Sequence, residues 1–486
     1  MRASVDGGLT AQYFVAGRVT TVFDPFIEAW RLRDLVMKGE LRPREVAESY
    51  LARIERLNPE LGAYMTVTPD RALADAARLE ASRPDAASMR LYGVAYSLKD
   101  LTPTAGIRTT LGSRNYADSI PPRDAVIAQR LQRAGGILLG KTTTPEFGGR
   151  PTTEGGLCPT ARNPWNREYN AGGSSGGAAA TVAAGLGLLA EGSDGGGSIR
   201  GPASNCGVVG LKPSRGRITY APHRGEGWGG YATRGPIARS VRDVAMMLDM
   251  IAGPAPGDPY WAPPPARPFE EAVRVLPRHL RLASIATSKL GNVDPEVAAA
   301  FDSACTTMRE MGHRVEPIDL DPGAMLVECT RILICVGIAA IPVTNPEWID
   351  PVVREMYEFG RKVSAADYVN LIATMHNIAR TIVERLEPYD ALLTPTMTRP
   401  AMRNGSFPSS PESYLDELWT WIAFEYPFNA TGQPAITIPA GFSRARLPIG
   451  LHIVGRPNGE FDLLALAATF EAARPWRDLR PPLSGD

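Results

Sequence analysis

The 486-residue chain has no excess of charge and few of the side chains that bind metals. Lys and Arg together number 52, as do Asp and Glu, so the net charge is zero and no basic surface for nucleic acid is predicted. Five histidines and five cysteines, with no C-x-x-C pair, predict neither a zinc site nor a disulfide framework. We therefore expect no metal, no cofactor, no nucleic-acid partner and a reducing, cytoplasmic location.

Long apolar segments are also missing. Residues 1–19 contain no apolar run typical of a secretory signal, so none is expected. The most apolar stretch, residues 178–190, is too short to span a bilayer and is rich in Ala and Gly. It predicts a tightly packed core helix and no membrane contact.

Helical and strand-like patterns alternate along much of the chain. Helices are predicted over residues 43–57 (ended by Asn58-Pro59), 125–134 (with Asp124 as N-cap), 241–251 (after Ser240) and 295–311. Short buried strands are predicted over residues 137–139, 280–285, 391–394, 435–438 and 449–454. Such alternation predicts an α/β protein. Seven prolines within residues 253–268 predict an irregular loop or linker.

Two glycine-and-serine islands, residues 172–177 and 192–200, are the most informative feature. Each puts a serine hydroxyl, Ser174 or Ser198, among backbone N–H groups that no side chain shields. A nucleophile and its oxyanion hole need that combination. Lys99 ends an apolar, strand-like run, where burial would make its amine a usable base. One lysine and two serines predict an acyl-transfer enzyme that needs no histidine.

Two other motifs match the same region by letter. Residues 135–142 spell the phosphate-binding pattern Gly-x-x-x-x-Gly-Lys-Thr, but the variable positions read as a strand and a helix precedes them. Lys141 is therefore interpreted as a strand-end lysine near a cleft. Residues 172–176 match the G-x-S-x-G nucleophile elbow, which requires an apolar strand before it, whereas residues 163–170 are a polar loop in this interpretation.

The islands, together with residues 202–217, 234–240, 428–435 and 447–450, resemble the amidase signature family of serine hydrolases over residues 25–475. The resemblance implies one large α/β domain, a mixed twisted sheet covered by helices, over residues 25–486. Residues 1–24 would be an N-terminal extension. A distal segment, about residues 320–430, would contribute to the substrate pocket.

By this resemblance the family's catalytic lysine falls on Lys99, its cis-serine on Ser174 and its nucleophile on Ser198. Lys99 would take a proton from Ser174, which takes one from Ser198. The oxyanion hole is implied to consist of the backbone N–H groups of Gly195, Gly196, Gly197 and Ser198.

The neighbours of these residues are expected to support them. Ser175 and Asp194 would orient the relay, and Arg200 would pair with a nearby carboxylate. Gly195 departs from the family, in which many relatives carry Ile or Thr at this position. Only the backbone N–H is needed there, so we expect some loss of rigidity with the chemistry intact.

The expected function is hydrolysis of the C–N bonds of small, largely apolar amides, including aryl and alkyl amides, with carbamates and esters as further substrates. Aromatic residues are frequent over 348–428, and those of residues 417–424 are expected to line an apolar pocket. Two alternatives remain: the glutaminase subunit of an aminoacyl-tRNA amidotransferase, disfavoured because no cationic cluster for a glutamine carboxylate is visible, and a non-catalytic scaffold. A homodimer is left open.

Overall fold

The computed structural model describes residues 10–15, 18–81, 89–408 and 410–483. The strands of its central sheet are β3 (Tyr64–Val67), β4 (Ala95–Lys99), β5 (Ile137–Thr142), β8 (Leu189–Asp194), β9 (Val209–Lys212), β10 (Thr233–Ala238), β11 (Arg281–Ser284), β12 (Arg314–Pro317), β13 (Ala391–Pro395), β14 (Ala435–Phe442) and β15 (Pro448–Gly455). Within the described residues the sheet has eleven strands, in the order β12-β11-β13-β15-β14-β9-β10-β8-β4-β5-β3.

The sheet is mixed. Strands β12, β11 and β13 are parallel at one end, and β8, β4 and β5 are parallel toward the other. The strands between them, and β3 at the edge, pair antiparallel. The predicted α/β class and mixed sheet are confirmed.

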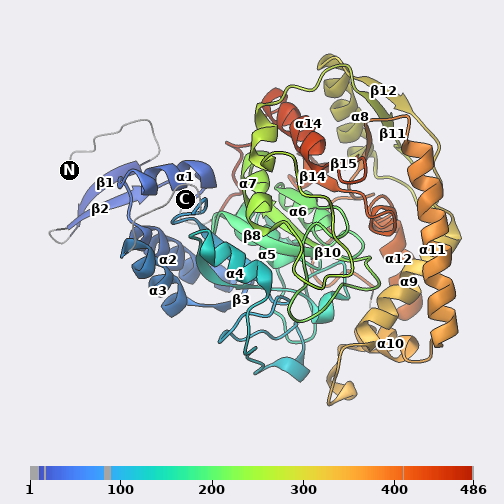
Figure 1. Cartoon of the computed structure of the whole chain (residues 1–486), viewed down its shortest axis with the longest axis horizontal. Helices are drawn as coiled ribbons and strands as arrows, with labels where there is room; N and C mark the ends of the chain where they lie inside the picture. The colour runs from blue at the N-terminus through green and yellow to red at the C-terminus, as the bar shows by residue number, and fades with distance from the viewer. Residues whose placement is uncertain (1–9, 16–17, 82–88, 409, 484–486) are drawn as a thin grey trace.

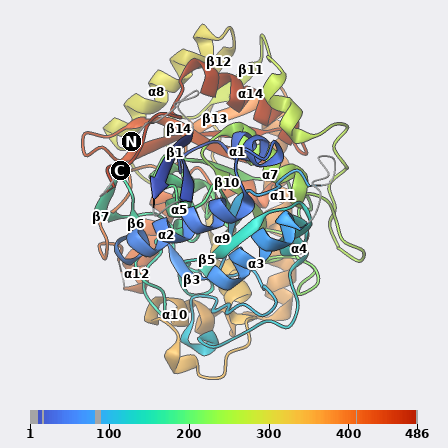
Figure 2. The same ribbon diagram turned by 90° about the vertical axis from the view of Figure 1, so that its left-hand side faces the viewer.

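Helices cover this sheet. They are α1 (Ala29–Met37), α2 (Pro43–Leu61), α3 (Pro69–Glu80), α4 (Val126–Arg133), α5 (Gly176–Ala183), α6 (Arg200–Cys206), α7 (Val241–Ile251), α8 (Pro295–Glu310), α9 (Ala324–Ala339), α10 (Pro351–Gly360), α11 (Ala365–Leu386), α12 (Pro411–Trp421), α13 (Pro427–Ala430) and α14 (Glu460–Ala473). Figure 1 shows α9 to α12 grouped at the side opposite α1 to α3. Figure 2 shows α2 and α3 close to β3 and β5, and both helices contact β5.

The remaining elements are short. Strand β1 (Thr10–Val15) pairs with β2 (Arg18–Phe23), and β6 (Arg162–Asn163) pairs with β7 (Asn166–Asn170), each pair antiparallel and outside the central sheet. Short 3-10 helices cover Arg114–Tyr116, Glu146–Gly148, Phe269–Arg274 and Pro346–Trp348. The first hairpin lies in the expected N-terminal extension, of which residues 1–9 and 16–17 are outside the described residues.

The prediction of one helix over residues 178–190 is wrong. Helix α5 ends at Ala183 and strand β8 begins at Leu189. Gly185 and Gly187, with φ angles of 63° and 159°, turn the chain between them. Alanine-rich helix and buried strand are equally apolar here, so hydropathy alone did not separate them.

Two helix ends also differ from prediction. Helix α2 continues through Pro59 to Leu61 and stops at Gly62, which has a left-handed φ of 60°. Helix α4 has Ala125 as its N-cap, because the Asp124 carboxylate instead accepts the Ala105 N–H at 2.7 Å. Residues 163–170, interpreted as a polar loop, form the β6–β7 hairpin.

The sheet brings the two serine islands to one edge. Strands β4 and β8 are parallel neighbours, so Lys99 and Asp194, their last residues, lie at the same end of the sheet. Helices α5 and α6 begin within the last residues of the two islands, at Gly176 and Arg200, and contact each other. The carboxyl ends of adjacent parallel strands are a frequent place for ligand sites in such folds.

Candidate active site

Lys99 lies at the centre of a buried cluster of hydroxyl groups. Its amine is 2.7 Å from the Ser174 hydroxyl and 2.9 Å from those of Ser175 and Ser193. The side chain is fully buried, and this burial lowers the pKa of Lys99 from 10.5 to about 7, although Glu191 and Asp194 act in the opposite direction. The amine is therefore available in its neutral form near pH 7.

Glu191 holds the strand end that carries Lys99. Its carboxylate accepts the Lys99 backbone N–H at 2.9 Å and the Thr102 hydroxyl at 2.9 and 3.0 Å. The Arg234 guanidinium lies 3.4 Å from the same carboxylate and donates to Thr102 at 2.6 Å. The charge of Glu191 is thus matched by Arg234, and not by a hydrogen bond to the Lys99 amine.

Ser174 and Ser175 precede helix α5. The Gly173–Ser174 peptide bond is cis, as the resemblance implies. A Cβ on Gly173 would lie 2.7–2.8 Å from backbone atoms of residues 150–152, so only glycine fits there. The Ser175 backbone N–H donates to the Ser198 carbonyl at 3.1 Å, and its hydroxyl donates to the Ser193 carbonyl at 3.2 Å. Ser175 therefore joins the two islands.

The glycine loop between β8 and α6 carries Ser198. The Asp194 carboxylate accepts the N–H of Gly197 at 2.8 Å and, at a longer 3.4 Å, that of Gly196. The Gly197 N–H is thus occupied, contrary to the expectation for the oxyanion hole. In the described part of the chain no acceptor binds the N–H of Gly195 or Ser198, and these two donors remain available.

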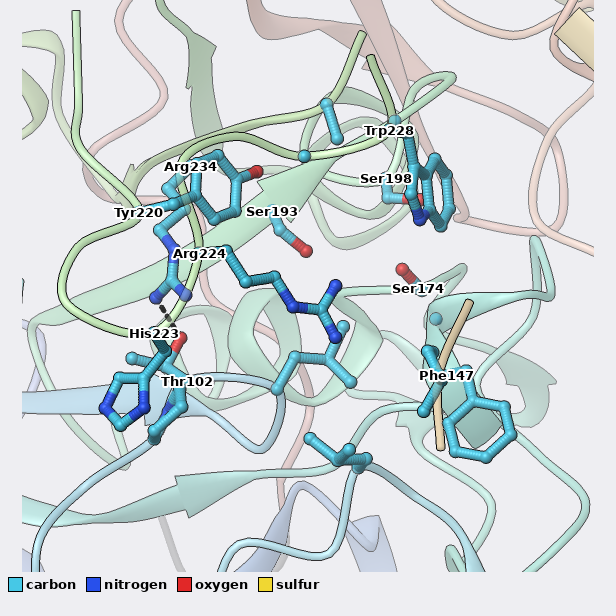
Figure 3. A pocket seen from close by; sticks show the side chains of 18 of the residues that line it. Thr102, Phe147, Ser174, Ser193, Ser198, Tyr220, His223, Arg224, Trp228 and Arg234 are labelled. Carbon is cyan, nitrogen blue, oxygen red and sulfur yellow. Dashed lines mark hydrogen bonds between the residues drawn. The ribbon is translucent and has the colours of Figure 1, made fainter. Parts of the chain in front are cut away.

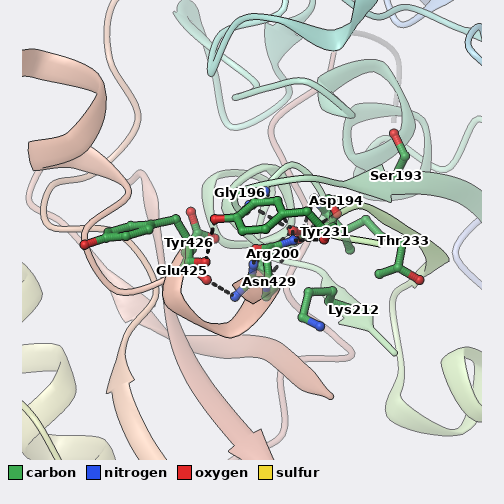
Figure 4. A network of polar contacts seen from close by, with 12 residues as sticks. Ser193, Asp194, Gly196, Arg200, Lys212, Tyr231, Thr233, Glu425, Tyr426 and Asn429 are labelled. Carbon is green, nitrogen blue, oxygen red and sulfur yellow. Dashed lines mark hydrogen bonds and ion pairs between the residues drawn. The ribbon is translucent and has the colours of Figure 1, made fainter. Parts of the chain in front are cut away.

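A buried ion pair fixes this loop (Figure 4). The Arg200 guanidinium donates two hydrogen bonds of 2.9 Å to Asp194, and Asn429 donates to the same carboxylate at 3.0 Å. Burial disfavours the charged carboxylate, but Arg200 outweighs it and holds the pKa of Asp194 well below its ordinary value. Arg200 pairs with a carboxylate as expected, while Asp194 contacts the glycine loop and not the relay serines.

Ser174, Ser193 and Ser198 line a cavity of about 280 Å3, here called the large cavity (Figure 3). Its apolar walls are Leu101, Pro103, Leu111, Phe147, Trp228, Ile341 and Pro342. Arg224 points into it, and in the described chain no side chain pairs with its guanidinium. The sequence showed no cationic cluster, but the fold places Arg224 and Arg234 in the lining of the same cavity. No residue of this lining carries a carboxylate.

A smaller cavity of about 50 Å3 also lies against the glycine loop. Gly195 to Ser198 form one wall, and the apolar side chains of Trp228, Ile334, Met356, Leu418 and Ile422 form much of the rest. The distal segment thus contributes to the site, but through aliphatic side chains. Trp419 and Trp421, expected at the pocket, are buried in the core instead.

The phosphate-binding interpretation of residues 135–142 fails as anticipated, because Ile137–Thr142 is strand β5. Lys141 is fully buried and donates to the Thr109 hydroxyl at 2.9 Å and the Thr104 hydroxyl at 3.1 Å. It does not line the large cavity. Among the residues the structure describes, no group of His, Cys, Asp or Glu is arranged to hold a metal, and no helix has the length and apolar character to cross a bilayer.

Comparison with known proteins agrees with this geometry. The amidase family matches residues 45–464. The chain belongs to the amidase signature family. It is accordingly a hydrolase of amide C–N bonds.

Individual relatives differ in what they act on. An acylamidase of Rhodococcus erythropolis is 36% identical over 94% of this chain and 97% of its own length. The matching subunit of the glutamyl-tRNA(Gln) amidotransferase of Geotalea daltonii is 34% identical over 93% of this chain and 98% of its own length. The structure of a 6-aminohexanoate cyclic dimer hydrolase superposes with a TM-score of 0.89 at 33% identity, covering 95% of this chain and 99% of that one.

Proposed function

We propose that this amidase cleaves small, largely apolar amides through an acyl-enzyme on Ser198, with Ser174 as proton relay and Lys99 as base. The supporting observation is the buried Lys99 amine, 2.7 Å from the Ser174 hydroxyl and with a pKa of about 7. A neutral amine has two N–H donors and one lone pair. It donates to Ser175 and Ser193 and accepts from Ser174, which matches its three contacts.

The reaction follows from these contacts. The Ser198 oxygen attacks the acyl carbon while its proton passes to Ser174, and the Ser174 proton passes to Lys99. The N–H groups of Gly195 and Ser198, with a contribution from Gly196, stabilise the oxyanion. Lys99 then returns the proton through Ser174 to the leaving nitrogen as the C–N bond breaks. Water repeats the sequence on the acyl-enzyme and releases the acid.

The large cavity supports a mainly apolar substrate with room for an aryl or alkyl group. An acyl-enzyme also forms from carbonyls with oxygen leaving groups, so esters and carbamates are included. The five cysteines are unpaired in this structure, which supports a cytoplasmic location.

The nucleophile is tested by labelling with a fluorophosphonate and by Ser198→Ala. We expect one adduct on Ser198 by mass spectrometry, and loss of anilide hydrolysis by at least about 10³-fold in the variant. An adduct on Ser174 contradicts the assignment. Absence of any adduct supports the non-catalytic scaffold.

One observation favours the glutaminase alternative: the unpaired Arg224 guanidinium could hold a carboxylate. Free glutamine also carries an ammonium group, for which no lining carboxylate is present. Hydrolysis of glutamine by the purified chain, compared with that of aryl amides, separates the two functions. A preference for glutamine over every aryl amide overturns our proposal.

A further inference from the structure

Trp228 lines both the large cavity and the small one, as do Gly148, Gly195 and Ser198, and it has the one large side chain among these four residues. It lies in the glycine-rich loop of residues 225–230, between β9 and β10, and its φ of 54° is in the left-handed region. Bulky residues rarely adopt that conformation, and where they do the surroundings hold them there. Figure 3 shows its indole ring beside Ser198.

Two glycines make the room for this ring. A Cβ on Gly195, in the loop that carries Ser198, would lie 2.6 Å from the indole. A Cβ on Gly337, inside helix α9, would lie 2.2 Å from it. Ring atoms of a tryptophan cannot give way like the end of a flexible side chain. The side chain missing at Gly195 is therefore replaced in space by Trp228.

Gly337 is otherwise unfavourable at its position. Glycine in the interior of a helix is less stable than alanine, since it loses more backbone entropy and contributes no side chain to packing. Helix α9 tolerates this glycine where the Trp228 ring packs against the helix. The ring is thus held between the helix and the glycine loop.

We propose that Trp228 is a specificity-determining residue, which closes the small cavity into an acyl subsite for short apolar groups. This inference rests on the proposed function. Ser174, which returns the proton to the leaving nitrogen, lines the large cavity and not the small one, so the amine part of the substrate occupies the large cavity. The acyl part then lies across the glycine loop, in the small cavity.

The lining of the small cavity fits such a group. Ile334, Met356, Leu418 and Ile422 are apolar, and the charge of Arg150 is paired with Asp350 at 3.3 Å. The two cavities differ in volume, about 50 against 280 Å3. A short acyl chain therefore fits, whereas a long one must displace the Trp228 ring.

The packing is tested without any chemistry, through the melting temperature of Gly337→Ala in two backgrounds. In the wild type we expect the melting temperature to fall, because the new methyl group collides with the indole. In Trp228→Ala the same change should raise it, because alanine is the better helix former and the collision is gone. If Gly337→Ala changes the melting temperature in the same direction in both backgrounds, the packing of Trp228 between the two glycines is contradicted.

The subsite is tested with nitroanilides that share one amine and carry acetyl, butanoyl or hexanoyl groups. In the wild type we expect kcat/KM to fall by roughly tenfold or more from acetyl to hexanoyl, a typical discrimination by pocket size. Trp228→Ala should remove most of this fall. Trp261→Ala, an exposed tryptophan that lines neither cavity, is the matched control. Equal rates for the acetyl and hexanoyl substrates in the wild type, or the same acetyl-to-hexanoyl ratio in Trp228→Ala, overturn the inference.

Labelling of Ser198 by fluorophosphonates with ethyl or octyl chains reads the same subsite without turnover. A protein that is labelled with chain-length selectivity but hydrolyses no anilide contradicts the proposed function and retains the subsite. Labelling at equal rates, with Trp228→Ala unchanged, contradicts the subsite alone.

Discussion

Lys99 and Lys141 lie on neighbouring strands and are both fully buried, yet they face different surroundings. In the pairing of β4 with β5, Lys141 is opposite Leu98, so the two lysines point to opposite faces of the sheet. Burial lowers the pKa of Lys99 to about 7 and that of Lys141 to about 8. A lowered pKa therefore does not by itself identify a base; the difference lies in what each amine contacts.

Lys99 contacts three serine hydroxyls, two of which line the large cavity. Lys141 contacts the hydroxyls of Thr104 and Thr109 and the Thr102 carbonyl, and Lys141 itself does not line that cavity. In the proposed mechanism the first arrangement moves protons toward a substrate, whereas the second holds the loop after β4 in place. Two predictions separate these roles directly, and two more test the groups around Lys99 and the large cavity.

The largest effect is expected from removing each amine. Lys99→Met should lower kcat/KM for anilides by about 10³-fold, within the range for loss of a general base, and should damage activated esters less because their leaving groups need no proton. Lys141→Met should keep kcat per folded molecule within severalfold but lower the melting temperature, since it leaves buried hydroxyls unpaired. The folded fraction, measured by circular dichroism, corrects both rates. Similar rate losses in the two variants would contradict the comparison.

The pH dependence of kcat/KM should follow one of these lysines only. Protonated Lys99 cannot accept a proton, so the rate should rise with pH, with a midpoint near the pKa of about 7. Lys141→Met should leave that midpoint in place. A midpoint that moves in Lys141→Met would indicate that Lys141 controls the pH dependence, and would contradict the assignment to Lys99.

Ser193 and Ser175 are expected to have intermediate effects. Each hydroxyl accepts a hydrogen bond of 2.9 Å from the Lys99 amine. These two bonds orient the amine so that its lone pair faces Ser174. Ser193→Ala should lower kcat by roughly tenfold, the value of one such bond. Ser175→Ala should cost more, because the Ser175 hydroxyl also donates to the Ser193 carbonyl at 3.2 Å and accepts the Ser193 N–H at 3.3 Å. A change in KM alone would indicate that Ser193 contacts substrate and does not orient the base.

The sequence predicts the parts of the site that its local pattern contains. Lys99, Ser174 and Ser198 are recognisable from an apolar run and two glycine islands. The Lys99 amine lies 2.7 Å from the Ser174 hydroxyl, and Ser174 and Ser198 line the same cavity. Ser193 stands inside the second island but reaches Lys99 only because β8 pairs with β4. Nothing in the local pattern indicates that pairing.

Other features depend on contacts distant in sequence. The Gly197 N–H is occupied because Arg200 fixes Asp194 beneath the loop. The sequence analysis expected only some loss of rigidity from the absent side chain at Gly195. In the structure the Trp228 ring occupies the space that this side chain would fill. Helical periodicity predicts the elements of the distal segment but not which side of each faces Ser198.

The smallest effect is expected at Arg224, the cation that reaches the large cavity from its exposed rim. Burial raises the pKa of Tyr116, and the positive charge of Arg224 opposes this rise. The charge of Arg224 therefore acts on another residue that lines the cavity. An anilide with a carboxylate on its ring should therefore gain over its methyl ester in the wild type. Solvent screens an exposed charge, so Arg224→Met should reduce this preference only about two- to fivefold. Adding salt to about 0.5 M should reduce the preference of the wild type similarly. The rate for the neutral ester should not change in Arg224→Met. An equal loss of rate for both substrates would indicate that Arg224 stabilises the loop around Trp228 and does not attract the substrate carboxylate.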